Sequence, residues 1–289
     1  MDPVDPIEPG DAAGRALRFV AARTVPAPAS PSDVRITLNF HPDRWVAGRL
    51  TLERMAADGV YASQFVTGTS AGGLTAHPGG DRWRWESRLF GGAYDTAPAD
   101  LRPVYGALDD RCRQVGAAPR FGSAHLRLTA ATLRRATFCH PDSYLEPTAQ
   151  ATVEGVSALV ASARRDREAG QCDPLDDYVE AHVHGGVRLD HDVEAVVLDP
   201  SHRGTAVEAA ARRLPCPVQW HAGFRLPVCE LRLHPDYRGA EFVELGVRIA
   251  VRGVLTARDI GDAARDGRGD EQALKRVWHL LARFGAPAD

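Results

Sequence analysis

Lysine is almost absent from this chain of 289 residues: of its 35 basic residues, only Lys275 is not an arginine. The 38 acidic residues leave a formal net charge of -3 at pH 7. That balance gives no general attraction to nucleic acid or to an anionic membrane. The planar, forked guanidinium of arginine suits phosphate and carboxylate ligands. However, Ala, Gly and Pro are abundant too, so the coding bias of a GC-rich genome explains the excess of arginine better than a function does. We therefore expect neither nucleic acid nor membrane as a partner.

Cysteine is scarce and unpaired along the sequence. The five cysteines are an odd number and none forms a CxxC pair, so neither a disulfide framework nor a cysteine-rich zinc site is expected. No apolar run approaches the roughly 20 residues that span a bilayer. The acidic, proline-rich N-terminus lacks the basic segment and apolar core of a secretory signal. These absences predict a cytoplasmic protein, with delivery by a specialised secretion system left open.

Short strands alternating with helices are typical of an α+β fold. β-Branched and aromatic runs predict strands over residues 34–40, 63–67, 120–128, 135–139, 193–198, 218–220 and 228–233. Helical spacing and end signals predict helices over residues 14–23, 50–58, 150–169, 206–214 and 270–284. The pattern changes near residue 204. We expect an N-terminal extension over 1–33, a catalytic domain over 34–203 and a C-terminal extension or small lobe over 204–289.

The most informative segment is Tyr-Val-Glu-Ala-His-Val-His-Gly-Gly, residues 178–186. Alternate residues of a strand share a face, so Glu180, His182 and His184 project from one side and apolar residues from the other. A carboxylate and two imidazoles are costly to bury without partners or a task. The segment therefore predicts a functional strand, and a surface strand with a solvated polar face is the plain alternative.

A flexible, hydroxyl-bearing loop covers residues 68–73, Gly-Thr-Ser-Ala-Gly-Gly. It lacks the lysine and the helix start of a phosphate-binding P-loop. His41 and Arg44 precede it at the end of the first strand, and a segment rich in arginine and tryptophan follows at residues 82–88. Guanidinium groups, indole faces and backbone amides together suit a ligand with a base and a pyrophosphate.

The two histidines also admit a metal site. His182 and His184 on one strand can present two imidazoles to one ion, as in a metal-dependent hydrolase. No recognised spacing supplies the third ligand, so the leading interpretation contains no metal.

Several segments together resemble a bacterial family known only as domain of unknown function 3626. They include Arg-Ile-Thr-Leu-Asn-Phe-His-Pro-Asp-Arg at 35–44, Gln-Phe-Val-Thr-Gly-Thr-Ser-Ala-Gly-Gly at 64–73, Trp-Glu-Ser-Arg-Leu-Phe-Gly-Gly-Ala-Tyr at 85–94, and Thr-Phe-Cys-His-Pro-Asp-Ser at 137–143. The similarity covers most of residues 34–200 and implies no activity.

The order of elements also resembles, more loosely, the ADP-ribosyltransferase superfamily. Those enzymes have a His or Arg on a first strand, a Ser or Tyr on a strand that binds NAD, and a catalytic Glu on a later strand. The resemblance implies a split, strongly bent, mixed or antiparallel sheet with flanking helices and a C-terminal α+β extension. His41 or Arg35 matches the first position, Thr69 and Ser70 the hydroxyl motif, and Glu180 the carboxylate.

The resemblance implies a set of site residues. The catalytic residues would be Glu180, His41 and Ser70. The residues expected to bind NAD are Arg35, Arg44, Gly68, Thr69, Glu86, Arg88, Tyr105 and His182.

Three classes of function stay open at this point. The first is an NAD-dependent enzyme that passes ADP-ribose to water or to an acceptor such as a protein, as an effector or toxin would. The second is a metal-dependent hydrolase that uses His182 and His184. The third is a module that binds a nucleotide or a protein without catalysis.

Overall fold

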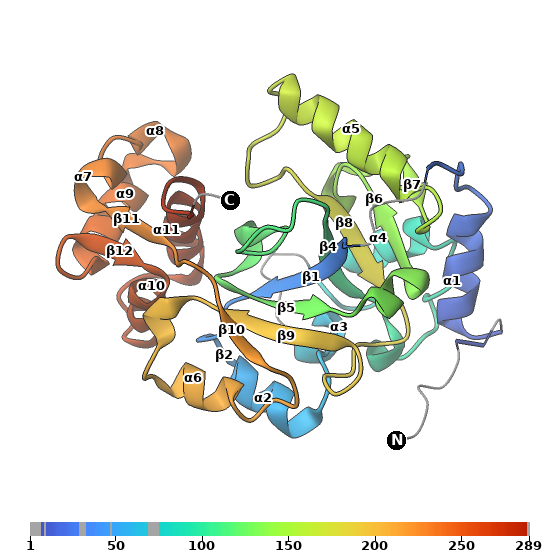
Figure 1. Cartoon of the computed structure of the whole chain (residues 1–289), viewed down its shortest axis with the longest axis horizontal. Helices are drawn as coiled ribbons and strands as arrows, with labels where there is room; N and C mark the ends of the chain where they lie inside the picture. Colours follow the sequence, from blue (N-terminus) through green and yellow to red (C-terminus); the bar gives the residue numbers. More distant parts are fainter. Residues whose placement is uncertain (1–6, 9, 29–32, 47, 69–74, 288–289) are drawn as a thin grey trace.

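A computed structural model describes residues 7–8, 10–28, 33–46, 48–68 and 75–287 of the chain. A mixed sheet of eight strands forms its centre (Figure 1). In spatial order the strands are β10 (Val218–Trp220), β9 (Val193–Leu198), β5 (Ala124–Leu128), β1 (Arg35–Phe40), β4 (Val104–Asp109), β8 (Val179–Val183), β6 (Ala136–Cys139) and β7 (Gln150–Ala151). Neighbours are antiparallel except for the parallel pair β9 and β10. The predicted α+β fold is confirmed.

Strand β8 shows why the sheet has one apolar and one polar face. Val179, Ala181 and Val183 join the main hydrophobic core, whereas Glu180 and His182 project from the opposite face. All five residues of β8 are buried, because β4 and β6 flank the strand and further segments cover its polar face. The surface-strand alternative is therefore wrong.

Helices cover the sheet in three groups. The main core includes side chains of α2 (Thr51–Asp58), α5 (Val156–Glu168) and α6 (Ala206–Ala211). A smaller cluster joins α1 (Ala12–Ala21) to the end of α4 (Asp81–Leu89) and the turn that follows it. The helices α7 (Val228–Leu231), α8 (Pro235–Arg238), α9 (Ala240–Ile249), α10 (Ala257–Arg265) and α11 (Glu271–Phe284) gather at one end of the molecule (Figure 1). Within the described residues, no helix is long and apolar enough to cross a membrane.

The C-terminal helices build a core of their own around Phe224, Leu255 and Trp278, with the antiparallel strand pair β11 (Arg225–Pro227) and β12 (Val254–Thr256). This core also takes in Val115 and Leu175 from the chain before it. The strand predicted over residues 228–233 is wrong. The chain pairs in β11 just before this run, and α7 then buries Leu231 against α9.

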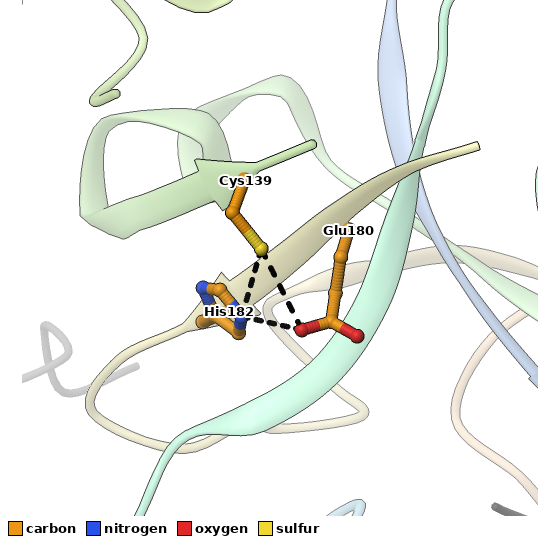
Figure 2. A group of neighbouring side chains, drawn as sticks. All are labelled: Cys139, Glu180 and His182. Atoms are coloured by element: carbon orange, nitrogen blue, oxygen red, sulfur yellow. Dashed lines mark hydrogen bonds and ion pairs between the residues drawn. The ribbon is translucent and has the colours of Figure 1, made fainter. Parts of the chain in front are cut away.

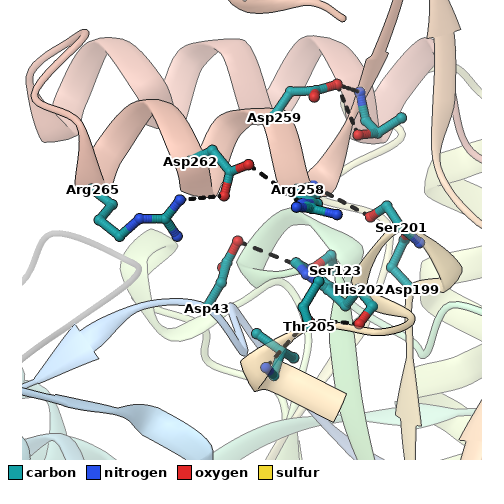
Figure 3. A network of polar contacts seen from close by, with 12 residues as sticks. Asp43, Ser123, Asp199, Ser201, His202, Thr205, Arg258, Asp259, Asp262 and Arg265 are labelled. Carbon is teal, nitrogen blue, oxygen red and sulfur yellow. Dashed lines mark hydrogen bonds and ion pairs between the residues drawn. The ribbon is translucent and has the colours of Figure 1, made fainter. Parts of the chain in front are cut away.

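Polar contacts join α10 to the segment that follows β9, and this segment to the one that follows β1 (Figure 3). The backbone N–H of Arg258 donates to Ser201 Oγ at 3.3 Å, and His202 Nε2 lies 3.9 Å from Asp43 Oδ2. Gly261 on α10 approaches Asp43 so closely that a Cβ there would lie 1.7 Å from the carboxylate. The C-terminal helices therefore pack directly on the segment that follows β1.

Two other segments differ from the sequence prediction. Residues 63–67, predicted as a strand, contain the short helix α3 (Gln64–Thr67), which ends at Gly68 in the left-handed conformation. The helix predicted over 150–169 divides into β7 and α5, because residues 152–155 leave the sheet edge in a turn. The remaining short elements are β2 (Trp45–Val46), β3 (Arg49–Leu50), η1 (Ala99–Leu101), η2 (Pro119–Phe121), η3 (Ala130–Arg135), η4 (Ser143–Leu145) and η5 (Pro200–His202).

The sheet splits between β1 and β4. Their pairing runs from Arg35↔Asp109 to Thr37↔Ala107 and stops there, although both strands continue. Past that point β1 pairs only with β5, up to Phe40↔Ala124, and β4 only with β8. The sheet therefore splits locally next to the end of β1, while all eight strands stay in one sheet.

Replacing Gly106 by alanine is expected to destabilise the protein at this split. A Cβ at Gly106 would meet Leu38 Cδ2 at 2.5 Å and Thr37 O at 2.7 Å, so the strands would have to move apart, at a cost of about 1–3 kcal/mol. Urea unfolding monitored by circular dichroism measures the loss. The variant Gly10→Ala is the control, because a Cβ there meets nothing within 4 Å. Equal midpoints for Gly106→Ala and the wild type would contradict the expectation.

Candidate functional site

A cavity of about 160 Å³ lies in the split of the sheet. The diverging ends of the two strands line it, Asn39 and Phe40 from β1 and Val104, Tyr105 and Gly106 from β4. The polar residues in its lining are Thr37, Asn39, His41, Arg44, Thr51, Arg54, Asp58, Tyr61, Ser63, Gln64, Thr67, Arg82, Tyr105 and Glu180. The loss of β1–β4 pairing therefore opens the space in which polar side chains of three adjacent strands meet.

Glu180 reaches the cavity from β8 and is only 8% exposed. Its Oε1 lies 2.8 Å from His182 Nε2 and 3.8 Å from Cys139 Sγ, as Figure 2 shows. Burial raises the pKa of Glu180, but its contacts with His182, with Ser143 and with the charge of Arg82 outweigh that effect and hold the pKa below 4.5. The cavity therefore contains an ionised carboxylate at neutral pH.

A chain of buried hydrogen bonds extends from Glu180 away from the cavity. His182 Nδ1 lies 3.1 Å from Thr137 Oγ1, which lies 3.0 Å from His184 Nε2. His184 Nδ1 in turn lies 2.7 Å from the hydroxyl of Tyr94. Burial lowers the pKa of His184 well below 6.5. With His182 Nε2–H donating to the ionised Glu180, each further hydrogen bond of the chain can also point toward Glu180, which fixes the direction of the carboxylate.

His41 faces the cavity directly after β1. Burial, with the charges of Arg44 and His202, lowers its pKa to about 3, so the imidazole is neutral and can donate or accept a hydrogen bond. The ring packs edge-on against Trp278 of α11, with centroids 5.0 Å apart. Trp278 Nε1–H donates to the backbone carbonyls of Pro119 and Arg120. The C-terminal helices therefore fix His41 from outside the sheet.

Tyr105 and Arg82 form another part of the cavity wall. The Arg82 guanidinium lies 4.2 Å from the centroid of the Tyr105 ring, a cation–π contact, and the Tyr105 hydroxyl donates to Glu86 at 3.3 Å. Arg82 is 5% exposed, and no carboxylate of the described residues lies within 4 Å of its guanidinium. Its charge favours the ionised forms of Glu86 and Glu180, while its buried Nε and Nη1 have no hydrogen-bond partner among the described residues and could donate to a ligand.

The structure brings four of the residues predicted from the sequence to this cavity, namely His41, Arg44, Tyr105 and Glu180. His182 lies directly behind Glu180. Thr69 and Ser70 lie outside the described residues, and Gly68 is the exposed end of α3.

The other three predicted residues do not line the cavity, although Glu86 lies behind its wall and accepts from Tyr105. Arg35 lies at the far end of β1, where it pairs with Glu194. Arg88 forms an exposed ion pair with Glu146. Glu86 is fully buried and paired with Arg102.

Three residues near Glu180 were not predicted as site residues. Thr137 and Cys139 face it from β6, because they are opposite His182 and Glu180 in the strand register. Their alternation with Ala136 and Phe138 was visible in the sequence, but nothing there gave the pairing of β6 with β8. Arg82 was noticed in a basic segment, but its burial against Tyr105 depends on how α4 packs.

The predicted metal pair meets at a hydroxyl group, since His182 Nδ1 and His184 Nε2 lie 3.1 and 3.0 Å from Thr137 Oγ1. His182 Nε2 turns to Glu180, whereas both nitrogens of His184 are taken by Thr137 and Tyr94. Among the described residues, the group that could hold an ion is Cys139, Glu180 and His182, whose ligand atoms lie within 4.8 Å of one another.

The family described as protein of unknown function (DUF3626) matches the chain over residues 35–164 and 161–284. The chain belongs to this family. The two matches include every residue that lines the cavity, and they extend through the C-terminal helices, so the DUF3626 domain comprises both hydrophobic cores. No curated protein is similar enough to count as a match.

Proposed function

We propose that this DUF3626 protein cleaves the nicotinamide–ribose bond of NAD and passes ADP-ribose to an acceptor or to water. The observation that carries the proposal is the meeting of His41, Tyr105 and Glu180 in one cavity. They come from β1, β4 and β8, which are neighbours in the sheet. A His-bearing strand, a Tyr-bearing strand and a Glu-bearing strand are the three parts that the resemblance to ADP-ribosyltransferases implies.

In this proposal Tyr105 takes the place first expected for Thr69 and Ser70. Those two residues follow α3, whereas Tyr105 is on the strand between those of His41 and Glu180. Its ring also lies edge-on to His182, with centroids 5.0 Å apart. The aromatic face, supported by Arg82 and His182, would hold the nicotinamide side of the ligand.

The charges fit the chemistry of nicotinamide release. Loss of nicotinamide leaves positive oxocarbenium character on the ribose, which an ionised carboxylate stabilises in the transition state. Glu180 has that charge, since its pKa is lowered. His41 is neutral and can hydrogen-bond a ribose hydroxyl. Arg44, with about a third of its side chain exposed at the cavity, would contact the pyrophosphate.

The size of the cavity suggests which part of NAD enters it. Pockets that enclose a whole ligand commonly measure roughly 300–1,000 Å³, whereas this one is about 160 Å³. We therefore assign the nicotinamide and its ribose to the cavity and the adenylate half to the surface beyond it.

The test is incubation of the purified, chelator-treated protein with NAD, with nicotinamide release followed by chromatography. We expect release above that of a protein-free control. If calorimetry shows NAD binding but no nicotinamide is released, the protein would be a module that binds NAD without catalysis. Neither binding nor release would contradict the proposal.

A further inference from the structure

Cys139, Glu180 and His182 have the composition of a zinc site (Figure 2). Cys139 Sγ lies 3.8 Å from Glu180 Oε1 and 4.0 Å from His182 Nε2, and the last two atoms are 2.8 Å apart. Tetrahedral zinc with bonds of about 2.0–2.3 Å separates its ligand atoms by about 3.3–3.7 Å. Shifts of about half an ångström would bring the three atoms to those separations.

We infer that Cys139, Glu180 and His182 bind a zinc ion at the wall of the cavity. A thiolate, an imidazole and a carboxylate favour zinc over magnesium or calcium, which prefer oxygen ligands alone. Glu180 lines the cavity, so water from the cavity could supply the fourth ligand. Binding exchanges the thiol proton of Cys139 for a sulfur–zinc bond, and the thiolate and carboxylate together balance the two charges of the ion.

The buried hydrogen-bond chain lets His182 become a ligand. In the metal-free protein His182 Nε2–H donates to Glu180, and this nitrogen must lose its proton to bind zinc. The chain can run in the opposite direction with its internal bonds kept, and the Tyr94 hydroxyl then gives up His184 as the acceptor of its own proton. His182 then donates through Nδ1 to Thr137 Oγ1, the Thr137 hydroxyl donates to His184 Nε2, and His184 Nδ1–H donates to the hydroxyl of Tyr94.

That reversal keeps one proton on each imidazole, so no charge is added to the core. It also provides the outer partner that a zinc-bound histidine commonly needs on its second nitrogen. The two histidines first expected to bind a metal together would therefore have different roles. His182 would contact the ion, and His184 would orient the His182 ring through Thr137.

Zinc would also switch off the proposed reaction. A carboxylate bound to the ion can no longer stabilise the oxocarbenium character of the ribose. The zinc site itself does not depend on the proposed function, but this inhibition rests on it.

The test begins with chelator-treated protein titrated with zinc against a chromogenic indicator, without NAD. We expect one zinc per chain in the wild type and a loss of affinity of at least about tenfold in Cys139→Ser and in His182→Gln. Thr137→Val should lose about 10–100-fold, because it breaks the outer partner of His182. Cys216→Ser is the matched control, since Cys216 is also buried but belongs to the hydrophobic core.

Cobalt in place of zinc gives a second measurement. A thiolate-to-cobalt charge-transfer band is expected in the wild type and in Cys216→Ser, and not in Cys139→Ser. Less than one zinc per chain in the wild type, or equal affinity in Cys139→Ser, would overturn the inference. Nicotinamide release separates the two proposals. If the protein binds zinc but never releases nicotinamide, the zinc site stands and the proposed function fails. If the protein releases nicotinamide but binds no zinc, the proposed function stands and the zinc site fails.

Discussion

Nicotinamide release should fall by about 100-fold or more when Glu180 is replaced by glutamine, while NAD affinity stays nearly unchanged. Glutamine keeps the size of the side chain and an oxygen that can accept from His182, so the buried chain survives. The lost charge acts mainly on the transition state, where the ribose becomes positive. The measurement is kcat from chromatography, together with the dissociation constant of NAD from calorimetry.

The pH dependence of this reaction gives a further check on Glu180. Because the pKa of Glu180 lies below 4.5, the carboxylate is ionised throughout the neutral range. The decline of kcat/KM that belongs to this group should therefore appear only below about pH 4.5. Glu146→Gln is the matched control, since Glu146 is exposed and pairs with Arg88 at the surface. Wild-type kcat in Glu180→Gln would remove the carboxylate from the mechanism.

The largest loss of stability is expected from Arg102→Met. Arg102 is 3% exposed, and its guanidinium donates to Glu86 at 2.5 Å and to the carbonyl of Tyr94 at 2.7 Å. Removing it leaves Glu86 buried without its ion-pair partner, which typically costs about 3–5 kcal/mol. Urea unfolding gives the change, and the double variant Glu86→Gln Arg102→Met should recover part of it, because no buried charge remains.

Glu86 also gives this prediction a pH dependence with a definite sign. Burial, opposed by Arg102, raises the pKa of Glu86 from 4.5 to about 7. The folded state therefore binds more protons than the unfolded state between these values, and this group's contribution to stability decreases as pH rises from about 4.5 to about 7. Arg102→Met should be more sensitive to pH over that interval, whereas Glu86→Gln should lose the dependence. Equal sensitivity in all three proteins would contradict the assignment.

The elements most readily predicted from the sequence were those with a strong local pattern. The β-branched and aromatic residues at 34–40 gave β1, the alternation at 178–184 gave β8, and the amphipathic run at 270–284 gave α11. Short apolar runs were less reliable. Residues 63–67 and 228–233 read as strands, but they form α3 and α7, whose ends are set by Gly68 and by the pairing of β11 with β12.

The candidate site shows the same division. Glu180 and His41 stood out because a charged or titratable group interrupts or ends an apolar strand. Tyr105 was selected too, but its role between these two strands follows from the order β1, β4, β8, which no local pattern contains. Cys139 and Thr137 became relevant only through the register of β6 with β8. The sequence also did not show that Glu86 pairs with Arg102 and so does not line the cavity.

The point where β1 and β4 stop pairing has a consequence for specificity. The facing edges of two strands border the cavity there, and a strand edge offers peptide N–H and C=O groups as well as side chains. A ligand held in part by such groups is recognised by atoms that every amino acid has. Substitutions along Asn39–Phe40 and Val104–Gly106 could then change what surrounds the ligand while its anchoring to the main chain persists. Under the proposed function, relatives with the same split could thus differ in acceptor and keep a common way of holding the part of the ligand that reacts.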